Sequence, residues 1–390
     1  MKYWFWLLLF TFISLKCSTT TDYIELPTEI ANKNIDYSIE RFSIDISDTL
    51  AYKYYDFFYD SDSTTSLAIC NDHTKRIELY SISNKRLIRS ASYDSISLET
   101  EKYGKINGIY MHSIDSLILM QKQRISVLVD FKVVHSREIN PELTSDKLPD
   151  NLFYNLWESN IYYDPADKSL LTMTYCANCK IHKETYYTAP IEGSISLENK
   201  NMDKLSSVHY PSIYLGKEYY GFCNQIYKAI NQNKSIHSFP IDPNIYVFDR
   251  KNNITTSFGG RSKFHKMEVA PLSKKFKYNS EEKLNHMYEM PHYGSIYYDP
   301  FRELYYRFFL KGMPIKNKDG TYNTWGDKEK VLMVFNSTFE LVKEIDLGRH
   351  TYTNTGTFVG PKGLYLSTGH YKNKEKKEMA LEYDIISFNF

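Results

Sequence analysis

The sequence has no excess of either charge and little glycine or proline. Its 390 residues carry 48 Lys and Arg against 47 Asp and Glu, and this balance argues against a general nucleic-acid binder, which needs a basic excess. With 16 Gly and 13 Pro, collagen-like and Pro/Gly-rich disordered chains are excluded. The 35 Tyr and 22 Phe supply apolar area for a large core, and the aromatic and β-branched bias favours strands.

The chain also lacks a long hydrophobic run. Residues 3–15 are apolar and follow Lys2, but this stretch is shorter than the roughly 20 residues that span a bilayer. It has the length of a signal-peptide core, so the part that follows it should be exported. The polar stretch Ser18 to Thr21 comes after Lys16-Cys17. No later run approaches about 18 apolar residues.

A hydrophobic segment that stops at a cysteine resembles a bacterial lipoprotein signal, in which the thiol is acylated and becomes the first residue. We therefore expect a signal segment over 1–17, lipidation at Cys17 and a tether over 18–34. The expected location is the cell envelope, anchored by lipid to the outer membrane, with the side it faces left open. Lys16 departs from the pattern, because a small residue normally precedes the cysteine. An ordinary signal peptide and an uncleaved anchor remain alternatives.

An internal repeat predicts the fold. Ile-Tyr-Tyr-Asp-Pro at 161–165 recurs letter for letter at 296–300, and weaker copies begin near 58, 109, 213 and 357. Each copy leads into a turn and further apolar strands, so that units of about 50 residues hold four short strands. This organisation is typical of propeller blades. The Asp-Pro pairs are expected to be structural turns.

The last unit ends after three strands, and residues 36–46 alternate as an edge strand should. We therefore predict an all-β fold over 35–390, a six-bladed β-propeller closed by an N-terminal strand. Two β-sandwiches are the alternative. The wide interval between the repeats at 213 and 296 predicts an insertion within 224–293, with loops or a short helix over 263–286.

The lipoprotein-like start, the Tyr-rich units and the repeated Tyr-Asp-Pro turn resemble Bacteroidetes six-bladed propeller lipoproteins of the domain-of-unknown-function 4221 family. The resemblance spans nearly the whole chain, and it implies a six-bladed propeller held at the cell envelope. The family has no established activity to transfer, so it implies no catalytic residue.

Polar residues where the chain enters the inner strands are the first candidate site. Carboxylate and amide oxygens that converge on a propeller axis can hold a hard cation such as Ca²⁺, which could polarise an ester in a hydrolase or lactonase-like enzyme. The alternative is that Asn and Asp are simply common where a loop meets a strand. The residues are Asp56, Asn107, Glu158, Asn160 and Asn354.

Two cysteines form the second candidate. Cys176 and Cys179 lie three residues apart, and in an oxidising envelope they could form a small-loop disulfide. Together with Cys223 and His182 they could instead bind a metal ion, and two free thiols are the third alternative. Cys70 lies in an apolar stretch and is expected in the core.

The loops between second and third strands are the third candidate. They are predicted at 71–76, 121–124, 176–184, 223–244, 311–330 and 370–378, with 17 Lys and Arg against 8 Asp and Glu. Concentrated positive charge attracts anions, and exposed aromatic rings can stack on sugars. Ordinary solvated loops are the alternative. The predicted ligand-binding residues are Tyr322, Trp325, His370, Tyr371, Lys372, Lys374, Lys376 and Lys377.

Familiar catalytic motifs are missing. The sequence has no nucleophile elbow, P-loop, His-Glu-x-x-His or dinucleotide fingerprint, although a Ser-His-Asp triad need not be visible in sequence. We therefore favour a binding or interaction module for an anionic glycan or another envelope protein over an enzyme. We expect no nucleic-acid partner and no cofactor, calcium entering only with the hydrolase alternative.

Overall fold

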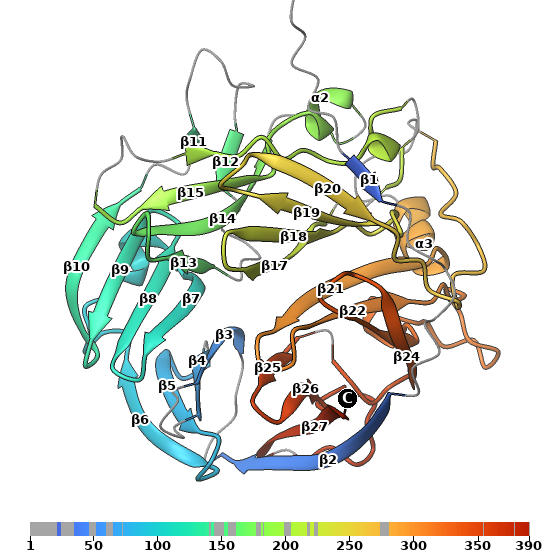
Figure 1. Cartoon of the computed structure of the whole chain (residues 1–390). Coiled ribbons are helices and arrows are strands. Elements are labelled where there is room, and N and C mark those ends of the chain that lie inside the picture. Colours follow the sequence, from blue (N-terminus) through green and yellow to red (C-terminus); the bar gives the residue numbers. More distant parts are fainter. Residues whose placement is uncertain are drawn as a thin grey trace, which may run out of the picture.

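Six small β-sheets form a ring, as Figure 1 shows. The structure is a computed structural model, which describes residues 22–24, 35–46, 52–59, 65–71, 73–139, 142–143, 152–154, 161–176, 181, 183–198, 204–216, 219–221, 225–273, 281–353, 355–377 and 379–389. Each sheet is one blade, and the first strands of neighbouring blades contact one another around the centre. The predicted six-bladed β-propeller is confirmed.

The first three blades occupy the first half of the chain. Blade 1 contains β3 (Tyr52–Tyr59), β4 (Thr65–Asn71), β5 (Arg76–Ser81) and β6 (Arg86–Ser92). Blade 2 contains β7 (Ile106–Ser113), β8 (Ser116–Gln121), β9 (Arg124–Val129) and β10 (Lys132–Glu138). Blade 3 contains β13 (Tyr162–Asp164), β14 (Ser169–Cys176), β15 (Glu192–Ser196), β16 (Lys204–Leu205) and the added pair β11 (Glu142–Leu143) and β12 (Leu152–Tyr154).

The other three blades follow, and two of them recruit N-terminal residues. Blade 4 contains β17 (Tyr227–Asn231), β18 (Lys234–Ser238), β19 (Ile245–Asp249), β20 (Ile254–Phe258) and, on its outer edge, β1 (Asp22–Ile24). Blade 5 contains β21 (His292–Asp299), β22 (Leu304–Leu310), β23 (Lys330–Phe335) and β24 (Leu341–Gly348). Blade 6 contains β25 (Phe358–Gly360), β26 (Gly363–Ser367), β27 (Ala380–Asn389) and β2 (Asp36–Asp45).

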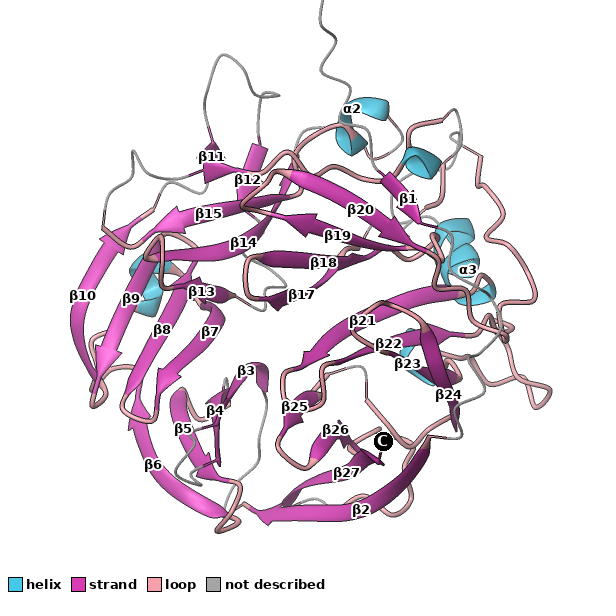
Figure 2. Cartoon of the chain, in the orientation of Figure 1, coloured by secondary structure: helices cyan, strands magenta, loops and turns pink. Residues whose placement is uncertain are grey.

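Helices are few and lie outside the sheets (Figure 2). Those among the described residues are α1 (Thr100–Tyr103), α2 (Glu184–Tyr187), α3 (Glu281–Glu289) and the 3₁₀ turns η2 (Ser212–Tyr214) and η3 (Trp325–Asp327). Within the described ranges, no helix has the length and apolar character needed to cross a membrane.

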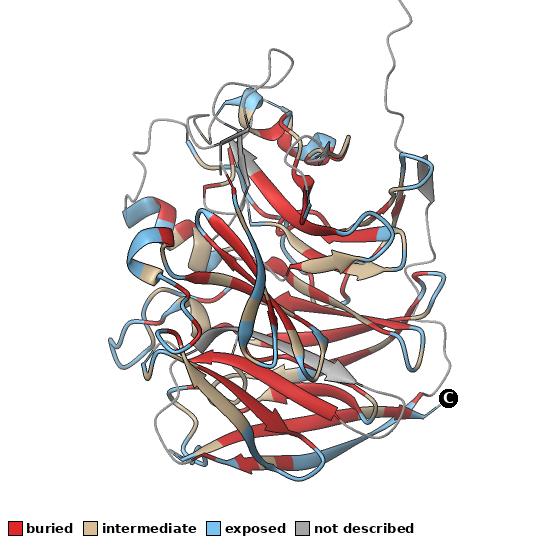
Figure 3. Ribbon diagram, turned by 90° about the vertical axis from the view of Figure 1, so that its left-hand side faces the viewer, coloured by how far each residue is buried: buried red, intermediate tan, exposed pale blue. Residues whose placement is uncertain are grey.

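The core lies between blades. Strands β4 and β23 are buried at every position, because each blade packs against neighbours on both faces, and such strands are apolar without alternation. One cluster joins Ile77 and Leu79 of blade 1 to Leu117 and Leu119 of blade 2. Cys70 belongs to the same cluster, as predicted. Figure 3 shows this burial along the inner strands and the exposure of the connecting turns.

The two ends of the chain close the ring. Strand β2 pairs antiparallel with β27 over ten residues, from Asp36 opposite Asn389 to Asp45 opposite Ala380. In Figure 1 the blue β2 lies beside the red β27. Phe42 and Ile44 are buried in a cluster shared by blades 6 and 1, while the start of β2 is exposed. The predicted closure by an N-terminal strand is confirmed.

The repeated Asp-Pro pairs are structural turns, as predicted. Asp299 Oδ1 accepts hydrogen bonds from the N–H groups of Phe301 (2.9 Å) and Arg302 (3.1 Å), and Tyr306 donates to Asp299 Oδ2 at 2.7 Å. Asp164 Oδ1 accepts the N–H of Ala166 at 3.0 Å. An Asp side chain that bonds to the backbone two residues on stabilises a turn.

The repeat placed near 213 is not a strand. That position lies in η2, which follows Pro211, and blade 4 begins at Tyr227. Tyr214 is buried among Tyr187, Tyr210 and Phe239, so its aromatic pattern reflects packing of a connecting segment. The predicted insertion over 224–293 is therefore wrong in extent, because residues 227–258 form blade 4 itself. Within 263–286 the described residues are loop and the start of α3, as expected.

The closing strand offers a matched test. Replacing Ile44 by Ala should lower the free energy of unfolding by about 2–5 kcal/mol, because it opens a cavity at a buried position. Replacing Ile39 by Ala, on the same strand but 51% exposed, should change it by less than about 0.5 kcal/mol. Urea unfolding measures both, and equal effects would contradict the assigned register of β2.

Candidate functional site

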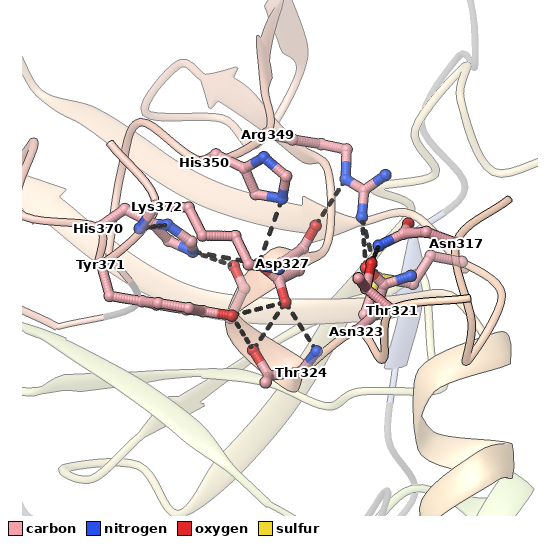
Figure 4. Close-up of polar contacts among 12 residues, drawn as sticks. Asn317, Thr321, Asn323, Thr324, Asp327, Arg349, His350, His370, Tyr371 and Lys372 are labelled. Carbon is pink, nitrogen blue, oxygen red and sulfur yellow. Dashed lines mark hydrogen bonds and ion pairs between the residues drawn. The ribbon is translucent and has the colours of Figure 1, made fainter. Parts of the chain in front are cut away.

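Three loops of blades 5 and 6 meet at the buried carboxylate of Asp327 (Figure 4). They are the β22–β23 loop (311–329), the β24–β25 loop (349–357) and the β26–β27 loop (368–379). Strands alternate in direction within each sheet, so these loops open at the same end of the propeller. This is the face on which the sequence predicted ligand-binding residues.

A capping box fixes the position of Asp327. At the start of η3, the N–H and the hydroxyl of Thr324 donate to Asp327 Oδ2 at 2.7 and 2.9 Å. The Thr324 side chain in turn accepts from the backbone N–H of Asp327. Such reciprocal bonds satisfy donors that the first turn of a helix leaves unpaired. Arg349 adds a hydrogen bond of 2.9 Å from Nε to the backbone oxygen of Asp327.

The neighbouring loops bring their side chains to the same carboxylate. Tyr371 donates its hydroxyl to Asp327 Oδ2 at 2.8 Å. Lys372 Nζ lies 2.9 Å from the other oxygen, Oδ1, and His350 Nε2 lies 3.2 Å from it. The two oxygens therefore have separate partners: Oδ2 accepts hydrogen bonds from Tyr371 and Thr324, and Oδ1 faces Lys372 and His350.

The partners keep Asp327 ionised. Burial by itself favours the neutral acid, but hydrogen bonds from Lys372, Thr324 and Tyr371 outweigh it, so the pKa of Asp327 lies well below its usual range. The hydrogen bond to Asp327 raises the pKa of Lys372. The pair is a charged one throughout the physiological range.

His370 is fixed by the backbone around it. Its Nδ1 accepts the N–H of Lys372 at 3.1 Å, so its proton lies on Nε2, which donates to Gly326 O at 3.1 Å. Both ring nitrogens are therefore used. The His370 ring stacks on Tyr371 with 4.7 Å between ring centroids, and burial lowers the pKa of His370.

A family model for a domain of unknown function, DUF4221, matches residues 33–346. The chain belongs to the DUF4221 family. A solved DUF4221 member from Bacteroides vulgatus ATCC 8482 is similar at 18% identity and a TM-score of 0.74, over 91% of this chain and 98% of that one. The expected membership of this family of six-bladed propellers is thereby confirmed.

A second solved structure shares the fold. It is a protein of Bacteroides fragilis NCTC 9343 whose name calls it exported, with 10% identity and a TM-score of 0.51 over 95% of this chain and 100% of that one. No curated protein matches the sequence. At these identities the likeness shows the propeller fold and leaves the activity to be argued from the site of this DUF4221 chain.

The residues predicted to bind ligand in this DUF4221 propeller fall into two groups. Tyr322 and Tyr371 are 63% and 60% exposed, and Lys374 and Lys376 are exposed with no side-chain partner among the described residues. The other four are less exposed or are paired with an acidic side chain. Lys372 and His370 belong to the Asp327 cluster, Lys377 Nζ lies 3.8 Å from Glu382, and Trp325 is half-buried against His292 and Lys328.

Of the four lysines in this loop that the sequence predicted to bind ligand, Lys372 is not free for an anion but is paired with Asp327. Three further lysines counted in the positive loops are buried, namely Lys228, Lys328 and Lys330. Lys328 donates to Met290 O at 2.5 Å and lies 2.8 Å from His292 Nδ1. Burial lowers the pKa of Lys330 to about 8. The number of lysines exposed on this face of the DUF4221 propeller is therefore smaller than the sequence count suggested.

The calcium candidates are only partly described. Asp56 and Asn107 lie within β3 and β7, where loops were expected, and a register shift marks Asn107 as the extra residue of a β-bulge. Glu158, Asn160 and Asn354 lie outside the described residues. Within the described ranges, no three His, Cys, Asp or Glu side chains are grouped as metal ligands. The calcium site stays a prediction.

The cysteine pair is also only partly described. Cys176 is the last residue of β14, with its Cα opposite that of Leu152. Cys179, His182 and Cys223 lie outside the described residues, as does Cys17. The disulfide, metal and free-thiol alternatives all remain predictions.

Sequence reasoning missed Asp327, Arg349 and His350. A local signal existed for Asp327, because Thr324 followed three residues later by an acid is a helix-start signature. No local signal exists for the contacts with residues 350, 371 and 372, which come from loops that only the ring brings together.

Buried histidines predict a pH dependence. Burial lowers the pKa of His265, His286, His292, His350 and His370 below the ordinary value, which is about 6.5 in unfolded chains. Below about pH 6.5 the unfolded chain therefore binds more protons, so the free energy of unfolding should fall as the pH falls from about 7.5 to about 5.5.

Urea unfolding at both pH values measures this effect. Replacing His292 by Gln should flatten the dependence, because it removes one titrating group. Constant or rising stability on acidification would contradict the assignment.

Proposed function

We propose that this DUF4221 propeller is an envelope-anchored binding module that captures an anionic glycan on the loop face of blades 5 and 6. The observation that carries the proposal is the pairing of two exposed tyrosines, Tyr322 and Tyr371, with exposed lysines on the same loops. An exposed aromatic ring offers a flat apolar face to a sugar, and the lysines attract carboxylate or sulfate groups.

The tyrosines are held in place before any ligand arrives. Tyr371 stacks on His370 and donates its hydroxyl to Asp327, yet most of its surface is exposed. The backbone of Tyr322 forms a β-bridge with Lys316, whose Nζ lies 4.6 Å from the Tyr322 ring centroid. A preorganised surface loses little conformational entropy on binding.

Binding is favoured over catalysis because Asp327, the buried acid of the cluster, is unsuited to proton transfer. Asp327 is ionised and fully bonded through Oδ2, its Oδ1 faces Lys372, and both nitrogens of His370 are engaged. A general acid or base needs a pKa near the working pH and access to substrate. Asp327, with a strongly depressed pKa and no exposed surface, meets neither condition.

The fold offers a place for the proposed anchor. Strand β1 begins five residues after Cys17 and lies parallel to β20, with Asp22 opposite Thr256 and Ile24 opposite Phe258. An extended chain spans at most about 3.6 Å per residue. A lipid on Cys17 would therefore attach the molecule by the rim of blade 4 and leave the loops of blades 5 and 6 accessible.

The charge of the loop face can be tested by reversal. Replacing Lys374 and Lys376 together by Glu should weaken binding to polygalacturonate about tenfold or more at an ionic strength of about 0.05 M, and the loss should shrink near 0.5 M as screening grows. Calorimetry measures the dissociation constants. The matched control replaces Lys132 and Lys251, exposed lysines of other blades, by Glu.

The aromatic part has its own variant. Replacing Tyr322 by Ala should weaken binding without changing its salt dependence, because the ring carries no charge. Polygalacturonate with methyl-esterified carboxylates should bind weakly to every form. Binding that ignores salt and survives these changes would show that the loops are an ordinary solvated rim.

The anchor is tested at the mature N-terminus. Full-length protein expressed in a bacterium with lipoprotein export should carry acyl groups on Cys17 by mass spectrometry and should fractionate with membranes. Replacing Cys17 by Ser should release it into the soluble fraction, while replacing Ser18 by Ala should not. A mature chain that starts beyond Cys17 without acyl groups would refute the anchor.

A further inference from the structure

Building on the proposed function, we infer that Asp327 is a resident counter-anion of the binding face. Its Oδ1 competes with an anionic ligand for Lys372, while its Oδ2 holds the exposed ring of Tyr371 in position. Asp327 is thus a positioning residue that also limits the affinity for anions.

The competition follows from geometry. Lys372 Nζ lies 2.9 Å from Asp327 Oδ1, and its side chain is 31% exposed while that of Asp327 is 0% exposed. The Lys372 side chain is therefore partly reachable from solvent, and its ammonium group is paired with a buried carboxylate. Lys374 and Lys376 on the same loop have no such partner among the described residues. Of these three lysines, only Lys372 is paired with a carboxylate of the described residues.

The carboxylate cannot move aside to release Lys372. Its Oδ2 accepts two hydrogen bonds from Thr324 and one from Tyr371, and Arg349 holds its backbone oxygen. A ligand must therefore share Lys372 with Asp327. It gains less from Lys372 than from a solvated lysine, since an anion next to Asp327 is also repelled by it.

The two oxygens allow the two roles to be separated. Asp327→Asn keeps one oxygen to accept from Thr324 and Tyr371, and replaces the oxygen that faces Lys372 by an uncharged group. Tyr371→Phe cuts the link to Oδ2 and keeps the Lys372–Asp327 pair, but it also removes the hydroxyl that interacts with Lys372. Both substitutions nearly preserve side-chain volume.

We expect Asp327→Asn to bind polygalacturonate about threefold to tenfold more tightly than wild type at low salt, with a steeper salt dependence, because one more cation contributes. Lys372→Met should cost less affinity in wild type than Lys374→Met does. Lys372→Met should also abolish the gain in the Asp327→Asn background. Additive effects in this double-mutant cycle would overturn the inference.

A purely structural role for Asp327 gives the opposite result. In that case Asp327→Asn weakens binding, as Tyr371→Phe should, and leaves the salt dependence unchanged. If Asp327→Asn does not fold, the comparison of Lys372→Met with Lys374→Met in wild type decides alone. An equal or larger loss at Lys372 rejects the inference.

A measurement without ligand separates this inference from the proposed function. Labelling with an amine-acylating reagent, followed by mass spectrometry, should modify Lys372 more slowly than Lys374 in wild type, and at a similar rate in Asp327→Asn. If Lys372 is labelled at the same rate in wild type and in Asp327→Asn, Asp327 is not its counter-anion, whether or not the protein binds polygalacturonate. Faster labelling with no polygalacturonate binding by any form rejects the glycan proposal and keeps the counter-anion.

Discussion

Closure of the ring by β2 and β27 is the constraint on which the rest depends. Blade 6 is complete only when a strand from the start of the chain joins three from its end. Its side chains then form one cluster with blade 1 through Phe42 and Ile44, and another with blade 5 through Leu364 and Ile386. A propeller blade cannot bury both faces alone, so an open ring would expose both clusters. The candidate site inherits this dependence, because its loops belong to blades 5 and 6.

The Asp327 cluster stabilises a charged side chain at a buried position. A buried carboxylate without partners is strongly unfavourable, and here five groups from three loops face it or its backbone. The same contacts order loops that have no core of their own. Arg307 solves a similar problem between blades 4 and 5, where its guanidinium donates to Ser238 Oγ and to the backbone oxygens of Asp242 and Pro243. Hydrogen bonds and ion pairs of polar side chains thus fix the loops and the links between blades, while apolar packing of the strands stabilises the blades.

The repeat and the alternation of residues 36–46 were enough to predict the propeller and its closure, because both are local patterns. The fourth repeat was misplaced because Tyr214 follows the aromatic pattern of a strand although it packs in a 3₁₀ turn. The site was predicted only in part. Tyr322 and Tyr371 are exposed as expected, but Lys372, Lys328 and Lys330 have partners or burial that depend on residues far away in sequence. A count of charges in the sequence cannot distinguish exposed lysines from buried or paired ones, because that difference depends on three-dimensional contacts.

Buried and exposed lysines of this face differ in how easily they can be replaced by substitution. Lys328 and Lys330 are buried beneath the loops, so their replacement would disturb the fold. Lys374 and Lys376 are exposed and form no side-chain hydrogen bond or ion pair with a described residue, so they can be exchanged at little structural cost. Loops on a rigid scaffold vary more freely than the strands they join, which agrees with a shared fold at 18% identity to another DUF4221 member. Lys372 combines the two situations, because its side chain is partly exposed and its ammonium group is paired with the buried Asp327. Replacing Lys372 would therefore change the exposed surface and the Asp327 cluster together.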